Sequence, residues 1–441
     1  MSHLTLGQAV RGGGPPHSGA NSAARQRVSR AQPRPDGRVA WTLVYLGFLG
    51  YVFAITTYKL PIGDSSIVAA MIGLLLLERG WRLPGLIRWA VVFLGWCALG
   101  YLQTDFPGVV WENVIFLAKL CLIMLVAANA LRSPAQIRFF MIFFLACYAL
   151  FPVRGTIVNY FVTHDTHHGR AVWNYIYANP NDLAALSLLL LSVAAALHAT
   201  ERTAWVRISA VAGIATLPVL ILMTQSRGGV IALCVFAVCS LSGHRRRLRT
   251  PLLATGLALG VIAVAPSDVW KRMKGLTQVA ESVDRVDPEG SGKARFEIWQ
   301  VAIGIIGDHP WTGVGWGAYP MAHAQFGLEL GQPDTHSTYL NVLAETGYPG
   351  LVLFLTLLWS AVREAEKARR LCRVSQPHVA LQLRYLELGL LAFLIAGVFG
   401  SYAKLSFLYL HLMLVWAVAQ NATRALQSAP TPIRRAPRRW A

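Results

Sequence analysis

Residues 182–200 read DLAALSLLLLSVAAALHAT, and this run decides the fold. A helix that crosses the hydrocarbon core of a bilayer needs about 20 predominantly apolar residues, and this run is of that length. Similar runs recur along the chain, and only 14% of its 441 residues are charged, whereas soluble domains carry about 25%. The sequence therefore predicts an all-α integral membrane protein.

Together, these apolar runs predict about 12 transmembrane helices and one large, mostly helical segment between the ninth and tenth. This segment covers residues 267–347. A second long connection, which is shorter than the first, covers about 157–181. We expect a disordered basic tail at residues 1–39 and a second basic tail at residues 421–441. The predicted spans lie near residues 40–58, 64–78, 86–102, 109–131, 137–156, 182–200, 206–224, 228–243, 250–266, 348–363, 381–400 and 403–420, and the second and eighth are the shortest.

The basic residues predict which way the helices run. With twelve spans, 28 of the 40 Lys and Arg residues fall on the side of both tails. Basic residues concentrate on the cytoplasmic side of membrane proteins, so both termini are predicted to be cytoplasmic. The net charge of +19 then reflects orientation, and no nucleic-acid partner is expected. Both long connections would face the opposite, external side.

The large external segment carries one group of candidate residues. Arg295 and Trp299 are four apart on a predicted helix, so they share a face. The glycine-rich residues 311–317 predict a tight loop rather than a nucleotide cradle, because they follow no strand. His336 would lie in the first turn of a short helix that Gly347 ends, at the mouth of the bundle.

Arg227 lies in the short external turn between the seventh and eighth spans. An arginine at membrane depth needs an anionic partner, and guanidinium groups bind phosphate with two parallel hydrogen bonds. Arg227 and Arg295 could therefore hold one diphosphate from two sides. Taken singly, Arg227 could reach lipid headgroups, Arg295 could pair with a glutamate, and His336 could be a hydrogen-bonded structural residue.

In combination, these residues resemble the O-antigen ligase and polymerase superfamily. The resemblance covers Ser226–Gly350 at motif level, and the whole chain in span count and in the place of the large loop. One departure is Ser337, where many relatives have Asn. The shared pattern consists of Asn179-Pro180-Asn181-Asp182, Arg295, Trp299, His309-Pro310, Gly313, Gly315, His336, Leu340, Glu345, Gly347 and Gly350.

The resemblance implies a GT-C-like membrane glycosyltransferase of the bacterial inner membrane. Such an O-antigen ligase transfers a glycan from undecaprenyl diphosphate to a sugar of lipid A–core, at a periplasmic site. Carried over, the essential residues are His336, Arg295 and Arg227. A histidine can act as a general base at neutral pH, and fixed arginines can stabilise a leaving diphosphate. We therefore expect inverting transfer that needs no metal and no cofactor.

Further residues are expected to bind substrate. Arg170 could contact an acceptor phosphate, Trp299 and Tyr339 could stack on sugars or polyprenyl, and Lys404 could reach a phosphate or anchor the interface. Asn179 and Asn181 belong to the matched motif.

Two other features have no assigned role. The histidine-rich residues 164–168 resemble a metal site in composition, but a solvated loop is favoured because helical ligand spacing is missing. Lys119 lies within a span, where it could be functional or could pair with a neighbouring helix.

Other functions remain open at this point. An O-antigen polymerase would use the same donor with a second diphosphate-linked glycan as acceptor. A protein O-oligosaccharyltransferase would use a Ser or Thr side chain. A transporter is the alternative from a different class, but transporters tend to contain internal repeats, and none is found in this sequence.

Overall fold

The computed structural model describes residues 35–77, 80–241, 291–325 and 333–428. Within these ranges the chain is helical and forms no β-strand, apart from one isolated bridge between His167 and Arg170. The predicted ninth span, residues 250–266, lies outside the described residues, as do residues 267–290 and most of both predicted tails.

In the described part of the chain, 8 helical segments are long and apolar enough to cross a membrane. The chain is therefore a multi-pass membrane protein, whereas the number twelve stays a prediction. These segments are α2 (Pro35–Thr57, from Val39), α4 with η1 (Gly85–Leu102), α5 (Pro107–Ala130), α6 with η2, α7 and η3 (Pro134–Thr163), α8 (Pro180–Thr200), α9 (Ala204–Met223), α16 (Thr338–Ser375) and α17 (Pro377–Ala396).

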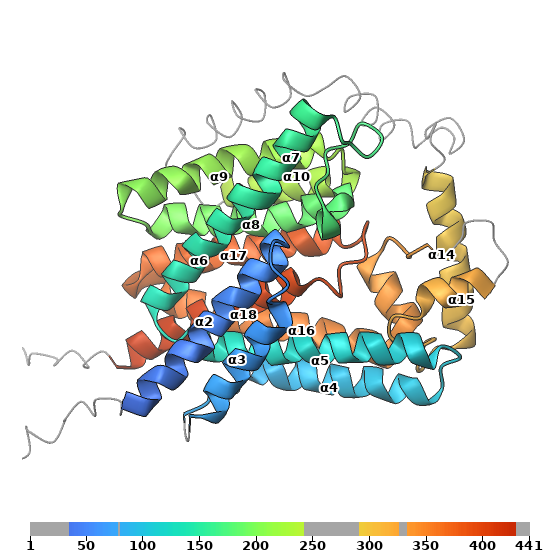
Figure 1. The fold of residues 1–441 in the computed structure, drawn as a ribbon, viewed down its shortest axis with the longest axis horizontal. Helices are drawn as coiled ribbons and strands as arrows, with labels where there is room; N and C mark the ends of the chain where they lie inside the picture. Colours follow the sequence, from blue (N-terminus) through green and yellow to red (C-terminus); the bar gives the residue numbers. More distant parts are fainter. Residues whose placement is uncertain (1–34, 78–79, 242–290, 326–332, 429–441) are drawn as a thin grey trace, which may run out of the picture.

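Two shorter apolar helices, α3 (Gly63–Leu75) and α10 (Arg227–Leu241), occur where the sequence predicts the shortest spans. At the centre lies α18 (Ser406–Gln427), whose residues 407–419 are all buried. It packs against α5, α16 and α17 (Figure 1). Because its neighbours cover it, α18 can carry polar groups such as His411, whose ring nitrogen lies 2.9 Å from the carbonyl oxygen of Leu386.

The two ends of the bundle differ. The start of α2 and the end of α18 lie together at one end, and the short helices α14 (Ser291–Asp308) and α15 (Tyr319–Gln325) lie at the other (Figure 1). The predicted large external segment is thus mostly helical in its described part. This arrangement is compatible with the orientation predicted from the basic residues.

Several helices run beyond their predicted apolar ends. The α6 helix continues to Thr163 through two π-helical stretches, Ala149–Val153 and Asn159–Thr163, the first of which accommodates Pro152. The α16 helix continues to Ser375, where pairs such as Arg370 with Glu366 stabilise the polar part. Hydropathy marks where a helix leaves an apolar environment, not where its backbone hydrogen bonding ends.

Candidate active site

The glycine-rich loop packs against a kink in α16. Gly347 has φ +68°, and a Cβ at this position would lie 2.2 Å from the carbonyl oxygen of Trp311. The Gly315 N–H donates a 3.0 Å hydrogen bond to the carbonyl of Glu345, just before the kink. The loop therefore satisfies backbone groups that the kink leaves unpaired, as a tight loop should.

His336 lies just before α16, in the left-handed backbone region at φ +52°. Its neighbours on both sides are fixed by hydrogen bonds. The carbonyl of Thr335 accepts a 2.8 Å bond from the indole Nε1 of Trp299 on α14, and the Thr338 hydroxyl donates a 2.6 Å bond to the carbonyl of Gly400. A strained residue persists only where its surroundings hold it, and such residues cluster at functional sites.

Arg170 joins two other segments of the same end. Its Nε donates a 2.9 Å hydrogen bond to the carbonyl of Thr224 in the α9–α10 turn. Its terminal Nη2 donates a 2.9 Å bond to Oδ1 of Asn181. Asn179 caps α8 by accepting a 2.9 Å bond from the backbone N–H of Asn181. The matched Asn-Pro-Asn stretch thus shapes the start of α8 and positions a guanidinium group.

These segments line a half-open cavity of about 350 Å³ at the α14 end of the bundle. Five residues predicted from the sequence line it together, although they come from three distant parts of the chain. The lining consists of His167, Arg170, Ala178, Asn179, Pro180, Asn181, Arg295, Ile298 and His336.

Charge in the cavity acts on the imidazole of His336. Burial and the nearby Arg295 guanidinium lower the pKa of His336, and Asp334 partly opposes them. The imidazole is therefore neutral near pH 7 and able to accept a proton. Asp334, whose charge acts on the imidazole, is a residue that the sequence reasoning did not select for the site.

Tyr402 is a second residue that the sequence reasoning did not select. Its side chain is buried, and its hydroxyl donates a 3.1 Å bond to the carbonyl of Asn181. Burial and Asp182 raise the pKa of Tyr402, and Arg295 and Arg170 oppose this rise. Tyr402 therefore lies among the same charges as the cavity, yet a lone tyrosine in a turn gives no signal in the sequence.

Arg227 is the first residue of α10 and follows the turn that Arg170 contacts. It is half-buried, but it is not among the residues that line the cavity. The structure thus brings Arg170, Arg295 and His336 together, with Arg227 on the neighbouring turn.

Lys404 and Tyr339 are engaged elsewhere. The Lys404 ammonium lies 3.2 Å from Oε1 of the fully buried Glu345 and 5.1 Å from the ring of Trp316. The Tyr339 hydroxyl donates a 2.8 Å bond to the carbonyl of Leu394 on α17. Neither residue lines the cavity, so their predicted contacts with substrate remain predictions.

Lys119 and the histidine-rich residues 164–168 have no role assigned from the sequence. Lys119 pairs across helices with Asp64 at 2.9 Å. His164, His167 and His168 are exposed, and only His167 reaches the cavity lining. In the described ranges, no group of three or more His, Cys, Asp and Glu residues could hold a metal ion.

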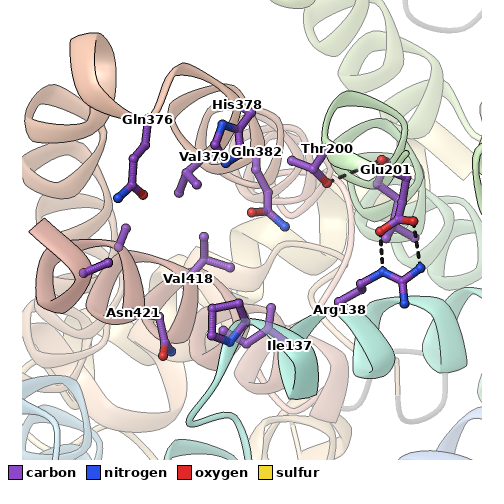
Figure 2. A pocket seen from close by; sticks show the side chains of 14 residues that line it. Ile137, Arg138, Thr200, Glu201, Gln376, His378, Val379, Gln382, Val418 and Asn421 are labelled. Carbon is purple, nitrogen blue, oxygen red and sulfur yellow. Dashed lines mark hydrogen bonds and ion pairs between the residues drawn. The ribbon is translucent and has the colours of Figure 1, made fainter. Parts of the chain in front are cut away.

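A second cavity, of about 230 Å³, lies at the opposite end of the bundle (Figure 2). The paired Arg138 and Glu201 form part of its wall, and their closest atoms are 2.6 Å apart. The α8 helix starts at the first cavity and ends at the second, which separates them by about 30 Å.

A family model described as O-antigen ligase matches residues 212–355. The chain carries an O-antigen ligase domain. This domain contains Arg227, Arg295 and His336, and the match supports the O-antigen ligase and polymerase superfamily that the sequence pattern indicated. The match points to a glycosyltransferase-like family, which agrees with the apolar membrane helices of this chain. No curated protein matches the chain.

The O-antigen ligase domain supplies only part of the cavity. The lining residues Arg170, Asn179 and Asn181 precede residues 212–355, which the family model matches. The site is therefore completed by helices outside the domain.

Proposed function

We propose that the protein transfers an O-antigen glycan from undecaprenyl diphosphate to a sugar hydroxyl of lipid A–core, on the periplasmic face of the inner membrane. The observation that carries this proposal is the cavity in which Arg170, Arg295 and His336 meet. Two guanidinium groups suit a diphosphate, because each can form two parallel hydrogen bonds with phosphate oxygens.

In the proposed reaction, His336 accepts the proton of the acceptor hydroxyl. The hydroxyl oxygen forms a bond to the anomeric carbon while the bond from that carbon to the diphosphate oxygen breaks, which inverts the configuration. Undecaprenyl diphosphate leaves with the bonding electrons. Arg295 and Arg170 stabilise its growing negative charge, and Arg227 supports the donor from the adjacent turn.

The lowered pKa of His336 suits this role. A general base must be neutral before it takes a proton, and a pKa at or below the working pH keeps it so. Because the arginines supply the positive charge, we expect the reaction to proceed in EDTA. Loss of transfer in EDTA, with recovery on adding a divalent ion, would contradict this mechanism.

Reconstitution tests the proposal. Purified protein in liposomes is given diphosphate-linked glycan and lipid A–core, and products are separated by size. Glycan on lipid A–core supports the ligase, whereas longer chains on undecaprenyl diphosphate would replace it with the polymerase. Transfer to neither acceptor would direct the assay to protein acceptors and then to transport.

The matched variants are His336→Ala and His309→Ala. His309 is an exposed histidine just after α14, outside the cavity lining. We expect His336→Ala to abolish transfer and His309→Ala to retain it. Equal loss in both would show that the imidazole in the cavity has no special role.

A further inference from the structure

Three arginines gather at the end of the bundle opposite the candidate active site. Arg82, in the turn before α4, donates a 3.4 Å hydrogen bond from its guanidinium to the carbonyl of Arg132, in the turn between α5 and α6. Arg424 lies in the last turn of α18. Their mutual effect is repulsive: burial and the neighbouring arginine charges lower the pKa of Arg82 and of Arg132 to about 10. Such a grouping is unfavourable unless an anion accompanies it.

No carboxylate neutralises this group within the described ranges. Arg138, the nearest arginine along the chain from Arg132, is paired with Glu201, but none of the three has an ion pair with a described residue. The carboxylate of Glu364 instead accepts a 3.2 Å bond from Gln420.

Two buried donors in the group also lack an acceptor. The side-chain atoms Nη1 of Arg82 and Nε of Arg132 are shielded from solvent and make no hydrogen bond to any described residue. Buried polar atoms are nearly always paired, so each such atom calls for a partner.

The positions of the arginines are fixed by other contacts. The side chain of Asn129, which is buried, accepts a 2.8 Å bond from the backbone N–H of Arg82 and donates a 3.1 Å bond to its carbonyl. The Arg132 guanidinium lies 3.6 Å from the centre of the Trp41 ring. Asn421 on α18, which is also seen in Figure 2, donates to the carbonyl of Leu131. The site is therefore preformed by α2, α5 and α18.

We propose that Arg82, Arg132 and Arg424 bind the phosphate of an anionic phospholipid, such as phosphatidylglycerol, in the cytoplasmic leaflet. Basic pockets between transmembrane helices on this side bind acidic headgroups. Trp41 is of the residue type found at the headgroup level, and its ring covers one guanidinium face. The headgroup phosphate would supply the acceptors that the two buried donors lack.

The test uses the full-length protein in neutral detergent and measures its unfolding midpoint. Phosphatidylglycerol, phosphatidylcholine and inorganic phosphate are added separately. We compare Arg424→Gln with Arg202→Gln, because both arginines are exposed and Arg202 lies in the α8–α9 turn, away from the group. Arg424→Gln removes charge without removing any side-chain bond between described residues.

We expect phosphatidylglycerol to raise the midpoint of the wild type and of Arg202→Gln, and phosphatidylcholine to raise neither. In Arg424→Gln the rise should fall by about half or more, because a third charge no longer attracts the phosphate. Without lipid, Arg424→Gln should be as stable as the wild type or more stable, since repulsion is relieved.

Three results would overturn the proposal. The first is an equal lipid response in Arg424→Gln and Arg202→Gln. The second is a lower midpoint of Arg424→Gln without lipid, which would indicate a structural role. The third is an equal rise with inorganic phosphate, which would indicate a site for free anions instead of a lipid. The double variant Arg82→Gln/Arg424→Gln should lose the response entirely, and retention there would contradict the assignment.

Discussion

The indole Nε1 of Trp299 donates a 2.8 Å hydrogen bond to the carbonyl oxygen of Thr335, the residue before His336. Trp299 is one helical turn after Arg295 on α14. One side chain therefore links the helix that carries the cavity arginine to the loop that carries the cavity histidine, and it sets the distance between the two.

Removing this bond should slow the reaction. In Trp299→Phe the loss of one hydrogen bond, about 1 kcal/mol, should lower kcat by about fivefold, with a smaller effect on KM. Trp311→Phe is the matched control, because that indole is 71% exposed. Steady-state kinetics of both variants check this, and a similar fall in kcat for Trp311→Phe would argue against a positioning role.

The pH dependence should report the surroundings of His336. Because burial and Arg295 lower its pKa below 6.5, kcat/KM should be high above that pKa and should fall as the pH drops through it. Arg295→Gln removes a lowering influence and should move the acidic limb to higher pH. Asp334→Asn removes a raising influence and should move it to lower pH. Shifts of the same sign in both variants would contradict the assignment of His336 as the base.

Arg170 and Arg227 should differ in their effect on the donor. Arg170→Lys cannot keep both 2.9 Å bonds, so the KM for the diphosphate donor should rise by about tenfold or more. Arg154→Lys, at an exposed position on α7, should leave it unchanged. Running Arg227→Lys in parallel measures what the adjacent turn adds, and a larger effect there than at Arg170 would reassign the main phosphate contact.

Gly347→Ala should destabilise the protein. A left-handed backbone costs about 1–2 kcal/mol for a residue with a Cβ, and that Cβ would also meet the carbonyl oxygen of Trp311. Gly304→Ala, on α14 where nothing lies within 4 Å of the added atom, should stabilise by about 0.5–1 kcal/mol. Thermal unfolding in detergent compares the two, and equal midpoints would refute the close approach.

Lys404 should matter chiefly for stability. Lys404→Met leaves the fully buried Glu345 without its cation, which should cost about 3–5 kcal/mol. The double variant Lys404→Met/Glu345→Gln should recover part of this loss, whereas Lys59→Met, at an exposed lysine, should have little effect. If Lys404→Met unfolds like the wild type but binds the donor poorly, then Lys404 contacts phosphate, as one interpretation of the sequence has it.

The sequence predicts the helices well because apolar runs depend only on local composition. It also predicts that Gly347 ends a short helix. The backbone at Gly347 is indeed non-helical, but α16 resumes directly beyond this kink. The hydrogen bonds that connect distant segments around the cavity could not be predicted in this way. Arg170 and Thr224 are separated by 54 positions, and Tyr402 and Asn181 by 221. Such contacts depend on how the helices pack, so a residue like Tyr402 shows its place only in the folded chain.

Four of the hydrogen bonds that connect segments around the cavity share one chemical property. The side chains of Arg170, Trp299, Thr338 and Tyr402 all donate to main-chain carbonyl oxygens of other segments. Every amino acid has a main-chain carbonyl, so the accepting residue can be replaced by mutation without loss of the hydrogen bond. During evolution, related enzymes can therefore diverge widely on the accepting side, and selection needs to retain only the donors.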